Sequence, residues 1–113
     1  MSMSTLRERS CIACKPGTPT VEPATASRLL SQLAPGWAIA PDGKSLERTW
    51  KFTDFHRTMA FVNAVAWIAH VEDHHPDLEM GYNRCRMRYT THAIGGLSQN
   101  DFICAAKVDA LGA

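Results

Sequence analysis

Residues 54–73, DFHRTMAFVNAVAWIAHVED, constrain the fold more than any other part of the sequence. Apolar side chains recur here at helical spacing and cover a broad stripe: Phe55, Met59, Val62, Ala66 and Ala69, widened by Phe61, Val65 and Ile68. A residue that precedes proline is disfavoured in the α-helical conformation, so the helix should end by His74 or His75, ahead of Pro76. We therefore expect one long helix with a wide apolar face and two adjacent histidines at its exit.

A short helix and a hairpin are predicted before this segment. Between residues 25 and 34 three leucines share a helical stripe, Thr25 is a candidate N-cap, and Pro35-Gly36 ends the pattern. Residues 37–52 contain two apolar runs joined by a Pro-Asp-Gly turn, which predicts a β-hairpin. Arg48 interrupts the apolar side of the second strand, so we expect one end of this hairpin to be exposed to water.

A second hairpin and a final helix are predicted after it. Residues 78–83 (LEMGYN) and 84–92 (RCRMRYTTH) resemble two strands, and the second alternates arginines with apolar side chains. Ser98 and Asp101 stand at the spacing of a capping box, which predicts the start of the last helix. The order αββαββα indicates an α+β fold: a single domain with a four-stranded antiparallel sheet and helices packed on one face.

The first 23 residues differ from the rest of the chain. A length of 113 residues with 45% hydrophobic side chains suffices for one core, which we assign to a folded domain at 24–113. Residues 1–23 contain three prolines and no periodicity, so they predict an extended N-terminal arm. The arm carries a CxxC at Cys11 and Cys14. A lone CxxC lacks the second ligand pair that zinc usually needs, so exposed or partly packed thiols are favoured over a metal or redox role.

Charge and hydropathy argue against several partners. The net charge of +1 gives no electrostatic reason to expect a nucleic acid or an anionic membrane as the main partner. No apolar run approaches the roughly 20 residues of a membrane helix, and the first residues lack the apolar block of a secretory signal. We expect a cytoplasmic protein, in which the four cysteines stay free thiols.

Four histidines in the second half of the chain are the candidate reactive groups: His70, His74, His75 and His92. Imidazole can act as an acid or a base near neutral pH, which makes an adjacent pair useful at a reacting centre. His70 and His74 also have the spacing of helical metal ligands, but Val71 stands where a hydrolytic zinc site would carry glutamate, so a metal site is disfavoured. Structural roles remain open: a charge at a helix C-terminus for the pair, a cap for Asp101 and a core position for Trp37.

Six residues stand in a fixed frame that resembles the signature of the pterin-4a-carbinolamine dehydratases: His74, His75, Pro76, Tyr82, His92 and Asp101. The segments PGW, FTDFHRTMAFVNAVAWIA and THAIGGLSQND are similar to that family too, so the resemblance covers roughly residues 24–111. One position departs from the pattern. His70 stands where the family commonly has a carboxylate, and Glu72 should lie on another face of the helix.

The resemblance implies a dehydratase that converts 4a-hydroxytetrahydropterin to quinonoid dihydropterin and water, in the recycling of tetrahydrobiopterin for an aromatic amino-acid hydroxylase. It implies catalytic roles for His74, His75 and His92. It implies substrate-binding or supporting roles for Asp101, Trp37, Pro76, Tyr82 and His70. No metal or organic cofactor is implied, because the pterin is the substrate.

The family also implies an oligomer and leaves alternatives open. Its members are homodimers or homotetramers, and Arg84, Arg86 and Arg88 would lie on a sheet face that no predicted helix covers. The same fold serves non-catalytic binding modules, namely a dimerisation cofactor of a transcription factor and a Rubisco assembly factor. An enzyme acting on a molybdopterin-type pterin is a third possibility.

Overall fold

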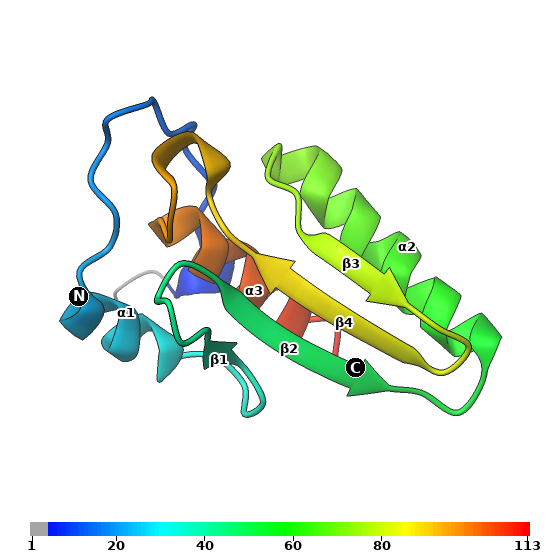
Figure 1. Ribbon diagram of the computed structural model, residues 1–113. Helices are drawn as coiled ribbons and strands as arrows, with labels where there is room; N and C mark the ends of the chain where they lie inside the picture. Colours follow the sequence, from blue (N-terminus) through cyan, green and yellow to red (C-terminus); the bar gives the residue numbers. More distant parts are fainter. Residues whose placement is uncertain (1–4) are drawn as a thin grey trace.

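Two hairpins combine into one antiparallel sheet in the computed structural model, which describes residues 5–113 (Figure 1). The first hairpin consists of β1 (Ala38–Ile39) and β2 (Leu46–Lys51), and the second of β3 (Asp77–Met80) and β4 (Arg84–Tyr89). The strand order is β1-β2-β4-β3. β2 and β4 pair along their whole length, from Leu46 opposite Tyr89 to Lys51 opposite Arg84. Both predicted hairpins are confirmed.

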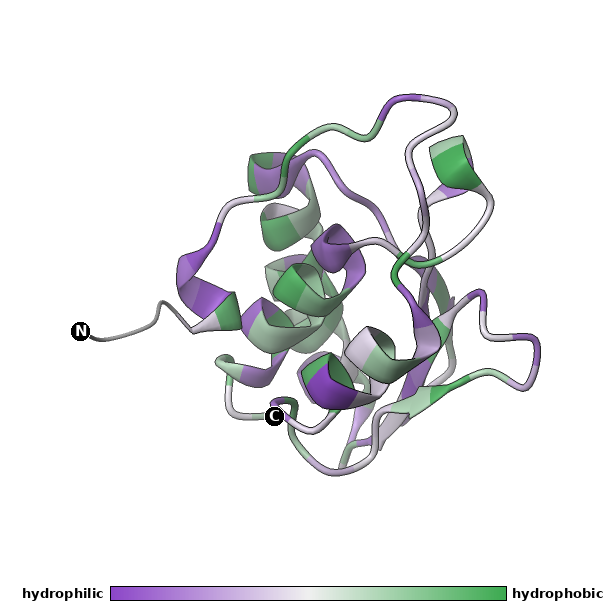
Figure 2. Cartoon of the chain, turned by 90° about the vertical axis from the view of Figure 1, so that its left-hand side faces the viewer, coloured by the Kyte–Doolittle hydropathy of each residue, from purple (hydrophilic) through white to green (hydrophobic). Residues whose placement is uncertain are grey.

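Three helices cover one face of this sheet: α1 (Pro23–Leu30), α2 (Phe55–Glu72) and α3 (Gln99–Asp109). Two short 3-10 helices, η1 (Leu6–Glu8) and η2 (His92–Ile94), complete the described elements. Viewed from the side, the helices form a layer on one side of the strands (Figure 2). The α+β fold and the αββαββα order are therefore confirmed. No helix within residues 5–113 is long and apolar enough to cross a membrane.

The first helix begins earlier than the sequence suggested. Pro23 occupies its first turn, Glu22 is the N-cap, and Thr25 lies inside the helix, so the prediction of a Thr25 cap was wrong. Proline is well suited to this place because the first amides of a helix have no intrahelical partner and the ring already holds φ near the helical value.

The long helix has the predicted boundaries but is rotated from the predicted stripe. Asp54 caps it by accepting a 2.8 Å hydrogen bond from the Arg57 amide, and the helix ends before the histidine pair. Its buried face consists of Thr58, Phe61, Val65 and Ala69, whereas Phe55 is 43% exposed. Because α2 is apolar on most sides, its sequence allowed more than one stripe, and packing against the sheet selected the one centred on Phe61.

The core lies between the inner face of the sheet and the helices. Cys85, Met87 and Tyr89 of β4 are fully buried there, next to Phe102 and Cys104 of α3. Arg48 also belongs to this side of the sheet, and the expectation that it marks a wet end was wrong. Its side chain is only 16% exposed, because it forms a 2.9 Å ion pair with Asp109 and lies over the Trp50 ring.

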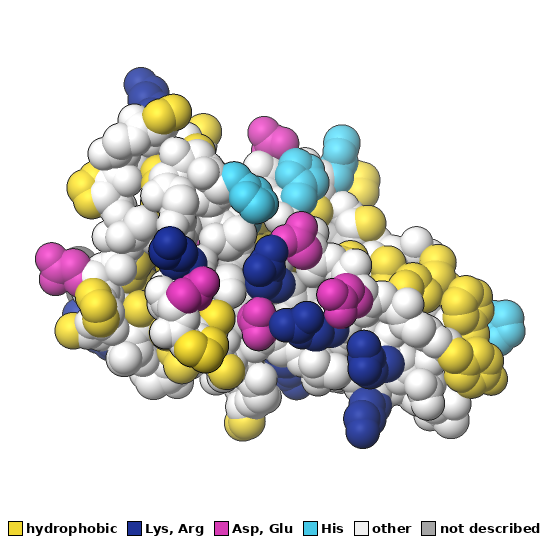
Figure 3. Space-filling model, in the orientation of Figure 1, with side chains coloured by type: hydrophobic (Ala, Val, Ile, Leu, Met, Phe, Trp, Pro, Cys, Tyr) yellow, Lys and Arg dark blue, Asp and Glu magenta, His cyan; other side chains and the backbone are white. Residues whose placement is uncertain are grey.

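The outer face of the sheet carries charges instead. Arg86 forms ion pairs with Glu47 at 3.2 Å and Glu79 at 3.5 Å, and Arg88 with Asp77 at 2.9 Å. Figure 3 shows these positive and negative side chains alternating across the face. In the part of the chain that the structure describes, no helix covers this side.

The N-terminal arm lies against the helical layer rather than projecting away from it. It contains one 3-10 turn, and Leu6 in that turn is only 3% exposed. Lys107 of α3 donates a 2.8 Å hydrogen bond to the Arg7 carbonyl, and the Val21 amide donates a 2.9 Å bond to the Leu97 carbonyl. The arm therefore crosses the start of α3 before the chain enters α1 (Figure 1).

Candidate active site

The exit of α2 places the two adjacent histidines in different environments. Asp73 adopts the left-handed conformation with φ of 50°, and the His74 amide donates a 3.2 Å hydrogen bond back to the Ala69 carbonyl. These are the features of a helix C-terminal cap, which turns the chain sharply. After this turn the His74 side chain is only 12% exposed, whereas His75 remains exposed just before Pro76.

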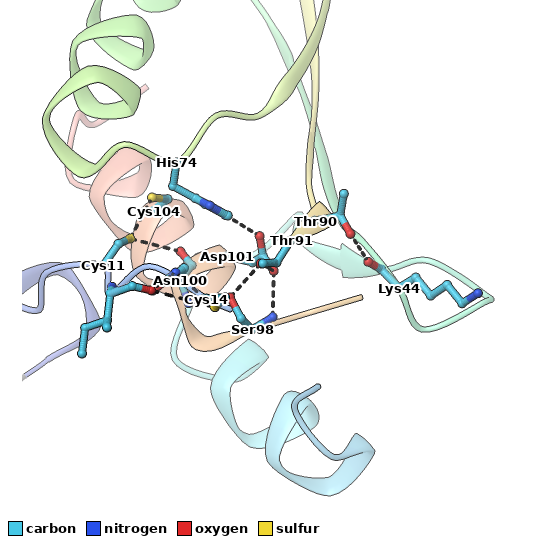
Figure 4. A network of polar contacts seen from close by, with 11 residues as sticks. Cys11, Cys14, Lys44, His74, Thr90, Thr91, Ser98, Asn100, Asp101 and Cys104 are labelled. Atoms are coloured by element: carbon cyan, nitrogen blue, oxygen red, sulfur yellow. Dashed lines mark hydrogen bonds and ion pairs between the residues drawn. The ribbon is translucent and has the colours of Figure 1, made fainter. Parts of the chain in front are cut away.

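A buried carboxylate holds His74 in place (Figure 4). Asp101 is 0% exposed, and its Oδ1 lies 2.6 Å from His74 Nε2. A carboxylate only accepts, so this contact places a proton on Nε2. Charge-assisted hydrogen bonds of this kind are about twice as strong as neutral ones.

The second oxygen of Asp101 is also satisfied. Oδ2 accepts 2.9 Å hydrogen bonds from the Thr91 hydroxyl and from the Ser98 amide. Because Thr91 uses its proton on Asp101, the Ser98 hydroxyl donates to Thr91 Oγ1 across 2.7 Å. The predicted capping box is confirmed, since Ser98 and Asp101 cap α3 reciprocally. Asp101, at the start of α3, also reaches His74 at the exit of α2. We call His74, Thr91, Ser98 and Asp101 the Asp101 network.

Tyr89 supports His74 from a second side. The two rings are nearly parallel, with an angle of 7° between them and 5.8 Å between their centroids. Burial raises the pKa of the Tyr89 phenol well above its usual range, and the nearby Cys104 thiol adds to the shift. The phenol therefore stays neutral. The stacked Tyr89 ring and the hydrogen bond to Asp101 together restrict the orientation of the His74 imidazole.

The third histidine comes from the segment between β4 and α3. Thr91 pairs with Gly96 as an isolated bridge, and the η2 turn between them starts with an exposed His92. His74, His75, Pro76 and His92 line one cavity of about 350 Å³. Figure 3 shows histidine side chains gathered beyond the charged face of the sheet.

A larger hollow of about 800 Å³ lies on the other side of the arm, between residues 9–22 and the start of α3. No histidine is among the described residues that line it. Proton transfer near neutral pH requires groups that titrate there, so the smaller cavity is the candidate active site.

The structure separates three predicted site residues from this cavity. Trp37 is buried, and its indole donates a 2.8 Å hydrogen bond to Asp109. Tyr82 lies exposed in the β3–β4 turn, at the other end of β3, with its ring against Phe55. His70 is exposed on α2 with its ring 5.4 Å from Trp67. Their roles toward a pterin therefore stay predictions that no contact among residues 5–113 supports.

Other residues of the site were missed from the sequence. Thr91 and Ser98 complete the Asp101 network, and Asn100 lines the cavity together with Ala13 and Cys14 of the arm. The capping motif located Ser98, but nothing in the sequence indicated that the arm would reach the histidines. Glu72 contacts the arm, which the sequence did not indicate, and accepts a 2.8 Å hydrogen bond from the Cys11 amide.

The arrangement is suited to proton transfer between fixed imidazoles and a small ligand. One imidazole is anchored through Nε2, and two exposed imidazoles face the same cavity from separate segments. Within residues 5–113 no group of three or more His, Cys, Asp or Glu side chains is placed to hold a metal ion.

Comparison with solved structures first defines the class. A transcriptional coactivator/pterin dehydratase from Brucella melitensis is similar with a TM-score of 0.79 and 27% identity, over 84% of this chain and 100% of that one. A pterin dehydratase-like protein identified as a RuBisCO assembly factor in the α-carboxysome has a TM-score of 0.59, over 67% of this chain and 88% of that one. At 23% identity the second likeness shows the fold alone. The chain therefore has the pterin dehydratase fold.

Sequence comparison then identifies the family. The family pattern described as Pterin 4 alpha carbinolamine dehydratase matches residues 19–111. A Nitrosomonas eutropha protein named "Putative pterin-4-alpha-carbinolamine dehydratase" is 57% identical over 94% of this chain and 92% of its own length. A Legionella pneumophila (strain Corby) protein of the same name is 47% identical over 96% of each chain. The chain belongs to the pterin-4-alpha-carbinolamine dehydratase family, as the sequence resemblance predicted.

Proposed function

We propose that this protein dehydrates 4a-hydroxytetrahydropterin, with 4a-hydroxytetrahydrobiopterin as the expected substrate, by histidine acid–base catalysis. In this elimination the proton on N5 is removed, a C4a=N5 double bond forms, and the 4a hydroxyl departs as water after it receives a proton. Acid and base catalysis of this type typically contributes about 10² to 10⁴ in rate.

The observation that carries the proposal is the convergence of three imidazoles on one cavity. His74 uses Nε2 to bind Asp101, which leaves Nδ1 as the nitrogen that could exchange a proton with a ligand. His75 and His92 line the same cavity, and both residues are exposed to solvent. The proposal assigns the acid and base roles to this set of three. Pro76, which fixes the corner after His75, would form part of the substrate wall.

The size of the cavity supports a small aromatic substrate. A volume of about 350 Å³ lies within the range of small-molecule sites, which starts near 300 Å³. We propose no metal or organic cofactor, because the pterin is itself the reactant and imidazoles can supply both proton transfers. By the same reasoning we propose a functional link to an aromatic amino-acid hydroxylase that forms the substrate. A cytoplasmic location is proposed as well, which the four free cysteines support.

A direct test replaces the two exposed histidines. We expect His75→Ala and His92→Ala each to lower dehydratase turnover by about 10² or more, with little loss of stability because neither side chain is in the core. The double variant should lose far less than the product of the two single losses, since groups that act as a unit are not additive. His56→Ala is the matched control, because His56 is also exposed but lies at the other end of α2.

The assay is stopped-flow absorbance of the carbinolamine generated in situ, corrected for its spontaneous dehydration, with circular dichroism as the folding control. Each protein is also measured after treatment with EDTA, which should leave the rate unchanged. Wild-type rates in both folded variants would contradict the catalytic assignment and favour a non-catalytic binding module, the role suggested by the name of the Brucella protein, transcriptional coactivator/pterin dehydratase. Turnover of a molybdopterin-type pterin but not of the biopterin compound would contradict only the proposed substrate.

We also propose that the chain forms a homodimer or homotetramer. The α2 helix exposes Trp67 and Val71, which are 65% and 58% accessible. Exposed apolar patches of this kind commonly mark contacts between copies. Light scattering in moderate salt should give a mass of two or four chains, and a monomer of 12.5 kDa would contradict the proposal.

A further inference from the structure

Three of the four cysteines, Cys11, Cys14 and Cys104, lie where the N-terminal arm crosses α3 (Figure 4). The Sγ atoms of Cys11 and Cys104 are in contact at 3.4 Å. The Cys14 sulfur lies 3.7 Å from the side-chain nitrogen of Asn100, one helical turn before Cys104. The proposed dehydration uses none of these thiols, so the CxxC and its partner on α3 need a separate explanation.

Hydrogen bonds hold Cys11 and Ile12 of the arm against the ends of α2 and α3. The Cys11 amide donates to Glu72 Oε1 at 2.8 Å. The side-chain amide of Asn100 clamps Ile12 twice, since its Oδ1 accepts from the Ile12 amide at 3.0 Å and its Nδ2 donates to the Ile12 carbonyl at 2.7 Å. Cys11 is therefore held against α3 with its sulfur on Cys104, and the contact does not depend on the sulfur atoms alone.

The same segment forms a thin wall between two hollows. Ala13 and Cys14 line the histidine cavity on one side and the larger hollow on the other. A backbone with open space on both sides has few packing contacts to restrain it, so the position of this wall depends on the contacts at Cys11 and Ile12. A covalent bond at Cys11 would fix the wall of the cavity.

We propose that Cys11 and Cys104 form a reversible disulfide, by exchange with a small-molecule disulfide, and that this bond locks the arm against α3 beside the histidine cavity. The Cys11 thiolate attacks the small disulfide RSSR, one RS⁻ departs, and Cys11 becomes a mixed disulfide. The Cys104 thiolate then attacks the Cys11 sulfur and expels the second RS⁻. The two protein thiols are oxidised, their protons end on two RSH molecules, and an added dithiol reverses the reaction.

Burial and distance select this pair among the possible ones. Cys85 is fully buried on the inner face of β4 and belongs to the core. The Cys14 sulfur is directed to the Asn100 amide and the Ile12 carbonyl rather than to Cys11. Cys11 is partly exposed whereas Cys104 is fully buried, so the oxidant can reach Cys11 first. The contact with Cys11, followed by burial, raises the pKa of the Cys104 thiol, so Cys104 is the poorer nucleophile of the two and Cys11 attacks the small disulfide first.

The experiment equilibrates the whole chain with oxidised glutathione at several ratios to reduced glutathione and then blocks free thiols. Trypsin should leave Cys11 and Cys14 in one peptide, residues 10–28, and Cys104 in another, residues 89–107, because the Lys15-Pro16 bond resists cleavage. We expect these two peptides to be linked under oxidising conditions, and fragmentation should assign the bond to Cys11. Cys14→Ser should keep the link, whereas Cys11→Ser and Cys104→Ala should abolish it. Cys85→Ala is the matched control and should keep it.

Hydrogen exchange supplies the second measurement and requires no substrate. Amides of residues 10–15 should exchange at least about tenfold more slowly in the oxidised wild type than in the reduced protein, and Cys11→Ser should show no such difference. A bond between Cys11 and Cys14, or no link at any glutathione ratio, would overturn the proposal. A Cys11–Cys104 bond without slower exchange would overturn the locking of the arm. Because neither readout uses pterin turnover, both are independent of the proposed dehydratase activity.

Discussion

Two polar networks in this molecule are built from similar groups but differ in burial. The Asp101 network lies under the histidine cavity, where the carboxylate is 0% exposed and accepts three hydrogen bonds. The ion pairs of the outer sheet face, formed by Arg86 with Glu47 and Glu79, lie in water, and the Glu79 side chain is 65% exposed. Both networks join segments that are distant in the sequence.

The difference shows what burial does to the same chemistry. In water, an ion pair contributes about 0 to 1 kcal/mol, because solvent and salt screen it and both side chains lose rotamer freedom. A buried carboxylate must have all its hydrogen bonds satisfied, and each partner is thereby fixed in position. The Asp101 network can hold His74 in one orientation, whereas the outer ion pairs, which water and salt screen, contribute little to stability.

The comparison would break first at Asp101. Asp101→Asn keeps the shape of the side chain but removes its charge. The new amide nitrogen must face at least one of the three groups that now donate to Asp101. We expect a loss of about 3 kcal/mol in the free energy of unfolding and a fall of about tenfold or more in dehydratase turnover, since His74 loses its anchor. Urea unfolding and stopped-flow kinetics measure the two effects. Wild-type stability and turnover together would show that the buried network is no more important than a surface pair.

A second prediction compares the inner and outer faces of the sheet by how stability changes at alkaline pH. On the inner face, burial raises the pKa of Tyr89, and contact with Cys11 raises that of Cys104, so both keep their protons in the folded state. The unfolded chain loses these protons above about pH 8.5 for the thiol and pH 10 for the phenol. The contribution of these two groups to the free energy of unfolding is therefore fully present below these pH values. It decreases as the pH rises above them, by up to about 1.4 kcal/mol per pH unit for each group. On the outer face, the hydrogen bond that Arg88 donates to the Asp77 carboxylate raises the pKa of Arg88, so that side chain stays charged throughout.

Tyr89→Phe separates the contribution of the Tyr89 phenol to the alkaline loss of stability from that of the Cys104 thiol. The Tyr89 hydroxyl has no hydrogen-bond partner among the described residues, so its removal should change stability by less than about 1 kcal/mol at pH 7. The variant should lose stability less steeply than the wild type above pH 10. Urea unfolding between pH 7 and 11 measures both. An unchanged slope above pH 10 would mean that the phenol is not protected from ionisation.

The smallest effect is expected on the outer face. Glu79→Gln removes one exposed partner of Arg86 and should change the free energy of unfolding by no more than about 0.5 kcal/mol at moderate salt. The difference from wild type should vanish near 1 M salt, where charges are screened within about 3 Å. If Glu79→Gln costs as much as Asp101→Asn, the outer face is buried in an oligomer and the contrast between the networks holds only for the single chain.

Local patterns in the sequence were sufficient for the order of elements and for several boundaries. Pro76 limited the end of α2, Ser98 and Asp101 located the start of α3, and the alternation in β4 separated its buried and charged faces. Each of these signals acts within a few residues, through φ restriction, capping or side-chain direction. The positions of Phe55, Arg48 and Thr25 were predicted incorrectly, because each depended on which surface packs beside it or on competition with a neighbouring cap.

By itself, the sequence determined the α+β class, the family and a set of candidate histidines, since periodicity, caps and motif spacing are written in short segments. The tertiary structure decided which of those residues meet. It placed Asp101 on His74 and Cys11 on Cys104, and it left Trp37, Tyr82 and His70 away from the cavity. The physical reason is that such contacts join segments far apart in the chain. Their geometry follows from the register of β2 with β4 and from the packing of the arm on α3, neither of which has a local signal.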